Sequence, residues 1–349
     1  MRGVNKLKRS VLLAHSIFGK RLAFEGIPIF ATDRCNSRCQ ICNIWRKSPK
    51  TDLDPETIKK ILEDKVITRY SSFILTGGEF ILHPKYREIL SLFNQYKNFY
   101  ILLSNGLLPD RLINTVREFR VKNLSISLDG CPETYRKIRG VDGYSCVERV
   151  VKELKDDDLR LSIGYTVSPW NIRDDLLHVI NFCSKYRVDL NIGYYCNMEY
   201  YDITKPADKL YRVDDLANHP YHRLYPQWSS GNLDMPCMSI FLRPVVRPNG
   251  DVELCEPKQI KLGNLHEQSL GEIWLSDRTR ELQRKYLHCN ACWHDAQRGC
   301  DIYVTSILKS FVPSSLAGVI LNGYNWQKIY RSMDSQFSNQ EKTKTRAKA

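Results

Sequence analysis

The residues best suited to chemistry are three closely spaced cysteines, Cys35, Cys39 and Cys42, in the pattern C-x3-C-x2-C. Three thiolates within eight residues can bind one metal centre and leave one position of a four-coordinate site open. An iron–sulfur cube bound in this way keeps one iron free for a substrate or cofactor. A zinc site would need a fourth ligand nearby, and no histidine lies between Ile27 and Phe80. The spacing therefore favours an iron–sulfur centre over zinc.

Small or polar residues follow three consecutive strands that hydrophobic runs predict. They are Gly77, Gly78 and Glu79 after the second strand, Ser104 and Asn105 after the third, and Ser127 and Asp129 at the end of the fourth. Two glycines allow a backbone to approach a ligand without a Cβ atom in the way. The polar groups suit hydrogen bonds to ribose and carboxylate groups. Asn-Gly and Asp-Gly are also ordinary turn sequences, so simple turns stay open as the alternative after the third and fourth strands.

Hydrophobic periodicity places these residues in an alternation of strands and helices. The predicted strands are 27–32, 72–75, 99–103, 123–128, 161–167 and 190–195, and the predicted helices are 55–63, 86–96, 110–119, 145–154 and 174–186. Asp54 is the expected N-cap of the first of these helices, with Pro55 in its first turn. Alternation of this kind predicts a parallel sheet with functional loops at the carboxyl ends of its strands.

A second group of cysteines lies between residues 237 and 300. Two hairpin-like pairs can enclose one further cluster or one zinc ion, and they are Cys237 with Cys255 and Cys289 with Cys292. A turn at 248–251 would join two short strands and bring the first pair together. Cys300 could replace one of these ligands or stay unbound. His288 and His294 flank the second pair and keep a structural zinc open.

The cysteine loop at the end of a first strand, followed by Gly-Gly-Glu at the end of the second, resembles the radical S-adenosylmethionine (SAM) superfamily over about residues 27–200. Ile41 departs from the aromatic residue that the family often has before its third cysteine. The resemblance implies an α/β fold, a partial (β/α)6 TIM-like barrel followed by a small cysteine-rich C-terminal domain. It also implies a [4Fe–4S] cluster on Cys35, Cys39 and Cys42, whose unique iron chelates the amino and carboxylate groups of SAM.

The same resemblance suggests roles for the polar residues. Gly77, Gly78 and Glu79 match the motif that receives the methionine amino group, and Ser104, Asn105, Ser127 and Asp129 match further SAM-contacting positions. Arg139 resembles an arginine near the SAM carboxylate, with Arg136 as competitor and Asn171 as a weaker candidate. One electron, from a donor such as flavodoxin or ferredoxin, would cleave SAM to methionine and a 5′-deoxyadenosyl radical that abstracts hydrogen from a substrate. The cofactor carries this chemistry and the protein positions it.

Residues 237–305 resemble the SPASM/twitch extension of radical SAM enzymes, helped by Leu262-Gly263-Asn264 and Ile273-Trp274. The cysteines suffice for one auxiliary [4Fe–4S] cluster, as in the shorter twitch form, with Cys237, Cys255, Cys289 and Cys292 as ligands. Cys196, after the last predicted strand, is a minor candidate for a hydrogen donor. No general acid or base can be named.

The remaining segments are predicted as a basic amphipathic helix at 1–24, a linker or irregular segment at 201–236 and, within 306–349, a C-terminal helix with a basic tail that is disordered from residue 331. The chain of 349 residues carries a net charge of +13, and six of its basic residues precede Glu25. The first helix would pack on the barrel, as we prefer, or lie on a membrane surface. With no export signal or membrane span recognisable, we expect a cytoplasmic enzyme, peripheral to a membrane if that helix binds one.

Two enzyme classes fit these features. The first modifies a ribosomally made peptide, as SPASM/twitch proteins often do, and the second oxidises or modifies a small-molecule, sugar or lipid-linked substrate. A zinc-binding, nucleic-acid-binding protein is the weakest reading, because the charge permits it but the order of motifs on a strand–helix barrel argues against it.

Overall fold

The computed structural model describes residues 26–201, 210, 211, 213 and 219–334. The predicted helix at 1–24 lies outside these residues. The chain divides into two compact units, one comprising the described part of residues 1–211 with Ile240–Arg284, the other comprising the described parts of residues 212–239 and 285–349. No helix in the described ranges is both long and apolar enough to cross a bilayer.

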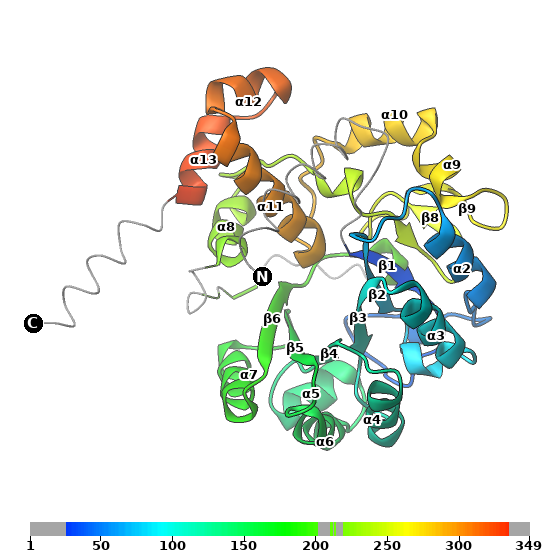
Figure 1. The fold of residues 1–349 in the computed structure, drawn as a ribbon. Helices are drawn as coiled ribbons and strands as arrows, with labels where there is room; N and C mark the ends of the chain where they lie inside the picture. Colours follow the sequence, from blue (N-terminus) through cyan, green and yellow to red (C-terminus); the bar gives the residue numbers. More distant parts are fainter. Residues whose placement is uncertain (1–25, 202–209, 212, 214–218, 335–349) are drawn as a thin grey trace, which may run out of the picture. The chain divides into compact units, whose positions relative to one another are not determined.

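The first unit is built on one sheet in the order β6-β5-β4-β3-β2-β1-β7-β8-β9 (Figure 1). Strands β1 to β6 are all parallel and follow one another in chain order. They are β1 (Ile27–Phe30), β2 (Ser72–Thr76), β3 (Phe99–Ser104), β4 (Asn123–Ser127), β5 (Arg160–Val167) and β6 (Asp189–Tyr194). This is the predicted partial (β/α)6 barrel, and the sheet is not closed, because β6 ends one edge of it.

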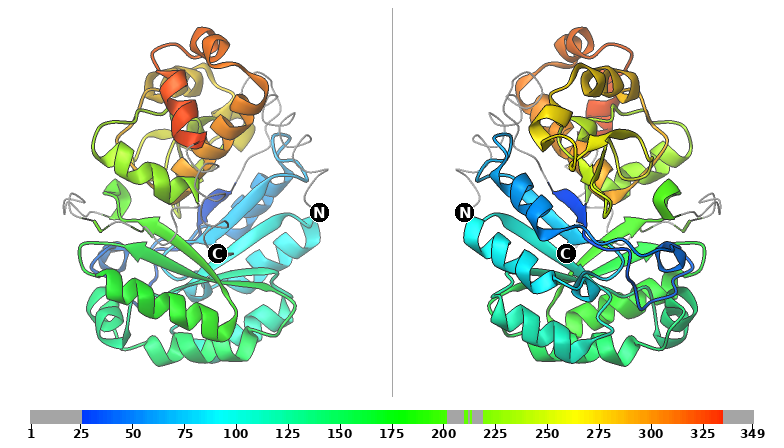
Figure 2. Two further views of the ribbon diagram at one scale, coloured as in Figure 1. Left: turned by 90° about the vertical axis from the view of Figure 1, so that its left-hand side faces the viewer. Right: turned by 90° about the vertical axis from the view of Figure 1, so that its right-hand side faces the viewer.

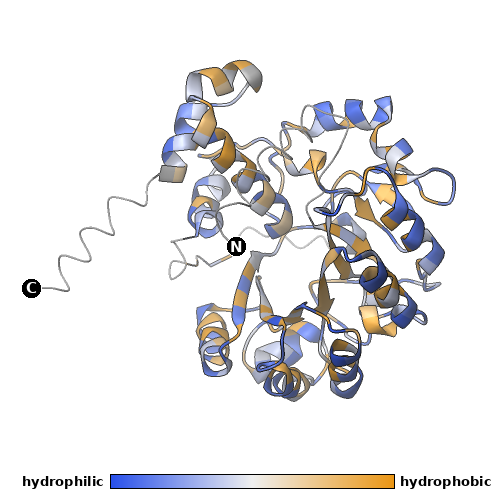
Figure 3. Ribbon diagram, viewed as in Figure 1, coloured by the Kyte–Doolittle hydropathy of each residue, from blue (hydrophilic) through white to orange (hydrophobic). Residues whose placement is uncertain are grey.

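Helices connect these strands and cover the outer face of the curved sheet (Figure 2). They are α2 (Pro55–Glu63), α3 (Tyr86–Tyr96), α4 (Pro109–Glu118), α5 (Pro132–Arg139), α6 (Tyr144–Leu154) and α7 (Arg173–Tyr186). Asp54 caps α2 as predicted, since its side chain accepts a 3.1 Å hydrogen bond from the Glu56 N–H. The helices carry both hydrophobic and hydrophilic residues, whereas β2 and β3 are mainly hydrophobic (Figure 3). Burial of the apolar helix faces against the sheet forms the core of this unit.

The edge of the sheet next to β1 is extended by residues from the predicted auxiliary domain. Strand β7 (Val245–Val246) pairs parallel with β1, and β8 (Asp251–Glu253) and β9 (Lys261–Asn264) follow antiparallel. The turn predicted at 248–251 joins β7 to β8, with Gly250 at φ 80°, where a residue with a Cβ atom is strained. Two further helices, α9 (Leu270–Trp274) and α10 (Asp277–Tyr286), follow the hairpins.

The second unit is helical, with α8 (Pro220–Ser229), α11 (Asp295–Phe311), α12 (Ser314–Ile320) and α13 (Trp326–Asp334). Helix α8 lies within the segment predicted to be irregular. Pro220 occupies its first turn, and its buried face comprises Tyr221, His222, Leu224 and Tyr225. The predicted disordered tail begins at residue 331, yet residues 331–334 belong to α13, and the rest of that tail lies outside the described residues.

The core of the barrel unit yields a direct stability test. Phe73 on β2 is fully buried and packs edge-to-face on Phe93 of α3, with ring centroids 5.2 Å apart. Phe73→Ala should destabilise the folded state by about 3–5 kcal/mol, because it leaves a cavity in a packed core. Phe99→Ala is the matched control, since Phe99 on the adjacent β3 is 51% exposed. Thermal unfolding of the metal-free chain compares the two, and equal losses would contradict the described core.

Candidate functional site

The three cysteines of the first group lie in the loop that follows β1. Cys39 is buried, while Cys35 and Cys42 are partly buried beside the core residues Phe30 and Val245. Burial, with a smaller contribution from the charge of Cys39, raises the pKa of Cys35 to about 12. Burial and the same neighbour also raise the pKa of Cys42. The three sulfurs are thus close enough to repel one another as thiolates, which is the condition that a positively charged metal centre relieves.

Main-chain hydrogen bonds hold this loop on two other elements. On one side, the N–H groups of Arg38 and Gln40 donate to the carbonyls of Arg139 and Ile138 in α5, at 2.9 and 2.8 Å. On the other side, residues 78 and 79 donate their N–H groups to the carbonyls of residues 32 and 34, both at 2.7 Å. The loop that carries the cysteines is therefore fixed between the turn after β2 and the C-terminus of α5.

Glycines allow both of these approaches. A Cβ atom on Gly78 would lie 2.2 Å from the carbonyl oxygen of Arg34, and one on Gly140 would lie 2.4 Å from that of Arg38. Gly77 and Gly140 also have positive φ angles, 143° and 66°. The Gly-Gly pair was predicted to let the backbone approach a ligand. In the structure its lack of side chains allows the cysteine loop to pack on β2, and its contact with SAM stays a prediction.

Glu79 joins the ends of β2 and β3. Its buried carboxylate accepts hydrogen bonds from the Ser104 hydroxyl at 2.8 Å and the Asn105 N–H at 2.7 Å. Burial raises the pKa of Glu79 to about 7, although these hydrogen bonds favour the charged form and lower the pKa. The Asn105 amide in turn donates to Asn36 Oδ1 in the cysteine loop at 2.8 Å. Glu79, Ser104 and Asn105, predicted from separate motifs, are thus brought together beside the cysteines.

Arg139 connects the cysteine loop with the end of β4. Its guanidinium forms an ion pair with Asp129, and Nη1 donates toward Cys39 Sγ at 3.8 Å. Arg139 is buried whereas Arg136 is exposed, so Arg139 is the arginine that faces the site. The Nε group of Arg139 is buried and has no hydrogen-bond partner within the part of the chain described. Asn171 donates to the carbonyl of Asp129 at 3.2 Å and so supports this turn.

Ser127 is the last residue of β4, one residue before the predicted end of that strand, and is half-buried. Its predicted contact with SAM remains a prediction. Cys196 follows β6 and is half-buried, and its predicted role as a hydrogen donor is likewise untested.

Sequence reasoning did not predict the contacts that Tyr200, Tyr201 and Arg247 make at the cysteine loop. The Tyr200 hydroxyl donates to Asp33 at 2.5 Å, and the Asn43 N–H donates to the Tyr201 carbonyl at 3.1 Å. The guanidinium of Arg247, after β7, lies over the Tyr200 ring, 3.9 Å from its centroid. These residues are distant in sequence and belong to no spacing motif, so only the fold brings them to the loop.

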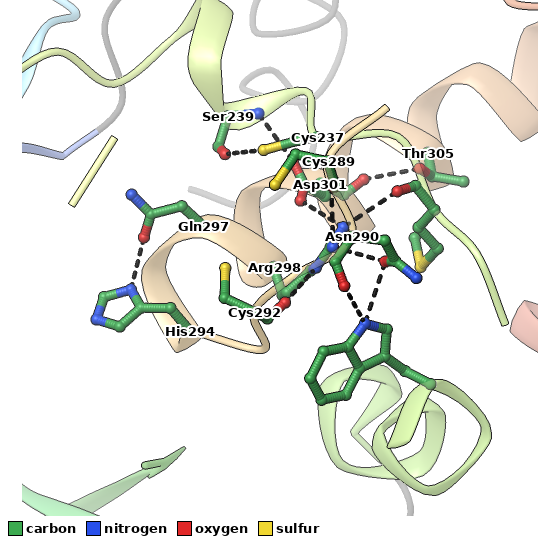
Figure 4. A network of polar contacts seen from close by, with 12 residues as sticks. Cys237, Ser239, Cys289, Asn290, Cys292, His294, Gln297, Arg298, Asp301 and Thr305 are labelled. Atoms are coloured by element: carbon green, nitrogen blue, oxygen red, sulfur yellow. Dashed lines mark hydrogen bonds and ion pairs between the residues drawn. The ribbon is translucent and has the colours of Figure 1, made fainter. Parts of the chain in front are cut away.

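Three cysteines of the second group meet in the helical unit (Figure 4). Cys237 and Cys289 lie in two loops. A 2.8 Å hydrogen bond from the Cys237 N–H to the Leu287 carbonyl joins these loops. Burial raises the pKa of Cys237 and of Cys292, and Cys292 interacts electrostatically with both other cysteines. Cys255 follows β8 and belongs to the barrel unit, so its assignment as the fourth ligand remains a prediction.

Across the described residues, no three His, Cys, Asp or Glu side chains are arranged to hold a single metal ion. A cube of four irons spreads its ligands farther apart than one ion does. The donor set of each group, three sulfurs close enough to interact electrostatically, fits such a cube better than it fits zinc.

The packing of Gly78 gives a second test. Gly78→Ala places a methyl group against the Arg34 carbonyl, so we expect a loss of about 1–3 kcal/mol and weaker iron binding by the first cysteine loop. Gly164→Ala in β5 is the control, because its Cβ would find its nearest atom at an ordinary 3.5 Å. Iron content and thermal unfolding of both variants measure the effect. Iron binding by Gly78→Ala at the level of the control would show that the loop does not depend on this contact.

The raised pKa of Glu79 predicts a pH dependence. Between about pH 4.5 and 7 the folded chain keeps a proton on Glu79 that the unfolded chain releases, so stability falls as pH rises through this window. The full loss is on the order of 3 kcal/mol. Glu79→Gln cannot ionise and should lack this loss. Thermal unfolding of the metal-free wild type and variant from pH 5 to pH 7.5 tests this, and parallel pH profiles would refute it.

Comparison with known proteins agrees with this geometry. The radical SAM superfamily model matches residues 29–183, and the model of an iron–sulfur cluster-binding domain, SPASM, matches residues 237–293. Fe-coproporphyrin III synthase of Methanosarcina barkeri is 24% identical over 147 residues, which are 41% of this chain and 37% of that protein. The antilisterial bacteriocin subtilosin biosynthesis protein AlbA of Bacillus subtilis is 23% identical over 271 residues, 72% of this chain and 59% of that protein. The chain thus spans less than two thirds of these curated relatives.

Among solved structures, Streptococcus suis SuiB bound to S-adenosylmethionine superimposes with a TM-score of 0.60 at 15% identity, over 75% of this chain and 68% of SuiB. At this identity the likeness concerns the fold. The two domain models, together with the cysteine loop at the carboxyl ends of β1 and β2, show that the chain belongs to the radical SAM superfamily and carries a SPASM-type domain.

Proposed function

We propose that the chain is a radical SAM enzyme that reductively cleaves S-adenosylmethionine and uses the resulting 5′-deoxyadenosyl radical to abstract hydrogen from a substrate. The observation that carries this proposal is the meeting of Cys35, Cys39 and Cys42 with the buried Arg139 beside them. Three sulfur ligands leave one iron of a [4Fe–4S] cluster open for SAM. When bound, this cluster supplies the electron that splits the sulfonium.

The chain's own residues would bind and orient SAM. Arg139 suits a carboxylate, because its guanidinium is a planar fork with a buried, unsatisfied Nε group. Glu79 suits an ammonium group, since a positive charge beside it would restore the ionised form that burial disfavours. Ser104, Asn105, Ser127 and Asp129 lie at the ends of β3 and β4, where they can hydrogen-bond the ribose. Together these residues would hold the nucleoside at the ends of the strands.

We further assign one auxiliary [4Fe–4S] cluster to Cys237, Cys255, Cys289 and Cys292. The grouping of three of these thiols around the buried Arg298 supports the assignment. Cys300, buried on α11, is the alternative ligand. A twitch-type single cluster held there would supply an acceptor for one electron from an oxidised substrate, which is the basis for classing the enzyme as an oxidoreductase.

A ribosomally made peptide is the substrate class we favour. AlbA, the relative matched over 72% of this chain, is named for the biosynthesis of a bacteriocin, and one SuiB structure holds its precursor peptide SuiA. A small-molecule, sugar or lipid-linked substrate is the second candidate, favoured by Fe-coproporphyrin III synthase as a relative. We place the enzyme in the cytoplasm with flavodoxin or ferredoxin as electron donor, and keep a membrane surface as the second candidate partner of the basic segment 1–24.

Anaerobic SAM cleavage tests the proposal. Reconstituted, reduced protein should release 5′-deoxyadenosine from SAM, and the variant Cys35→Ala with Cys39→Ala and Cys42→Ala should release none. The same variant should keep about four irons per chain on the auxiliary ligands. Release of 5′-deoxyadenosine is measured by chromatography and iron by a colorimetric assay. Cys183→Ala is the control, because Cys183 is a buried thiol of α7 outside both groups.

Three outcomes would count against the proposal in different ways. Purified protein that binds only zinc and releases no 5′-deoxyadenosine would overturn the enzyme. Complete loss of iron in the triple variant would overturn the auxiliary cluster alone. A short peptide encoded beside the gene that keeps both its mass and the configuration of its residues when incubated with enzyme, SAM and reductant would count against the peptide class.

A further inference from the structure

The loop that carries Cys289 and Cys292 is organised by one buried arginine of α11. Arg298 is 1% exposed, and its donors reach the carbonyls of Cys292 through Nε at 3.0 Å and of Cys289 through Nη2 at 3.4 Å. Nη2 also donates to Asn290 Oδ1 at 2.7 Å, and Nη1 to the carbonyl of Met235 at 3.3 Å (Figure 4). The guanidinium of Arg298 thus binds the main-chain carbonyls of both cysteines in the C-x2-C pair.

Asp301, one helical turn after Arg298, is the counter-charge. It is fully buried and lies 3.1 Å from Arg298 Nη1, and its other oxygen accepts the Ser239 N–H at 2.8 Å. The Ser239 hydroxyl in turn lies 3.4 Å from Cys237 Sγ. The ion pair therefore lies next to all three cysteines of this unit. Arg298 contacts the C-x2-C loop directly, and Asp301 lies toward Cys237 through Ser239.

The two charges lie at different places around the thiols. Asp301 accepts the N–H of Ser239, whose hydroxyl lies 3.4 Å from Cys237 Sγ, whereas Arg298 donates to the carbonyls of Cys289 and Cys292. Reduction of a cluster adds negative charge, so a fixed positive charge nearby favours the reduced state and a negative one opposes it. Hydrogen bonds around the ligands also fix ligand geometry and tune a metal centre.

We propose that Arg298 and Asp301 are positioning residues of the auxiliary cluster and set its reduction potential in opposite directions, Arg298 raising it and Asp301 lowering it. This inference rests on the proposed auxiliary cluster. Because the pair is buried and neutral as a whole, removal of either partner leaves the other charge uncompensated beside the cluster. Removal of both should cancel most of the change.

The test uses the chain with Cys35→Ala, Cys39→Ala and Cys42→Ala, so that only the auxiliary cluster is observed. In this background the reduction potential is measured by titration followed by electron paramagnetic resonance, together with iron content. Arg298→Gln should lower the potential, Asp301→Asn should raise it, and the double variant should return toward the parent value. Arg298→Lys keeps the positive charge but lacks the planar guanidinium. This variant should bind less iron than the parent chain, and its reduction potential should differ from the parent value by less than that of Arg298→Gln.

The chain contains a matched control pair. Asp277 and Arg280 on α10 are also three residues apart and form an ion pair at 3.8 Å, but both side chains are exposed. Asp277→Asn and Arg280→Gln should leave potential and iron content unchanged.

The possible outcomes distinguish the auxiliary cluster itself from the effect of Arg298 and Asp301 on its reduction potential. Absence of iron in the parent triple variant would overturn the auxiliary cluster itself. Iron bound normally with the same potential in Arg298→Gln and Asp301→Asn, or shifts of one sign in both, would overturn this inference and leave the cluster standing. Asp301→Asn keeps the shape of the side chain and the oxygen that accepts the Ser239 N–H. The reduction potential of this variant therefore tests the inference even if Arg298→Gln does not fold.

Discussion

The main-chain hydrogen bonds that fix the first cysteine loop are the constraint on which the site depends. The loop has little regular structure of its own, and its carbonyl and N–H groups are satisfied by the turn after β2 and by the end of α5. Both partners approach so closely that Gly78 and Gly140 have no room for a side chain. Because the parallel strands place these elements at one edge, Arg139 and Glu79 arrive beside the cysteines together with the loop.

Each of the two units also has a buried ion pair beside its group of cysteines. Arg139 with Asp129 adjoins the first cysteine group, and Arg298 with Asp301 adjoins the second. In each pair the arginine also donates toward a cysteine, to Sγ of Cys39 in one case and to the carbonyl of Cys292 in the other. A charge buried next to thiolates costs free energy unless it is paired, so each carboxylate both neutralises and orients its arginine. Such fixed charges suit clusters whose chemistry depends on potential.

Much of the barrel was predictable from hydrophobic periodicity, because each strand and helix buries one regular face. Helices α2 and α3 begin and end at the predicted residues, and the strands differ from prediction by at most two residues at an end. Helix α5 was not predicted, although Pro132 at its start and Gly140 after its end are ordinary helix signals. Its eight residues contain few apolar positions, so periodicity alone gave no signal. The role of Arg298 and the hydrogen bonds that join Glu79 to Ser104 and Asn105 were beyond prediction, since they depend on contacts between distant segments.

The central claim is that the clamped loop holds a cluster with one open iron for SAM. Electron paramagnetic resonance of the reduced, reconstituted wild-type protein with and without SAM tests it most directly. The account predicts that SAM changes the signal of one cluster, the one lost on removal of Cys35, Cys39 and Cys42, and leaves the auxiliary signal as it was. A spectrum unchanged by saturating SAM would contradict it.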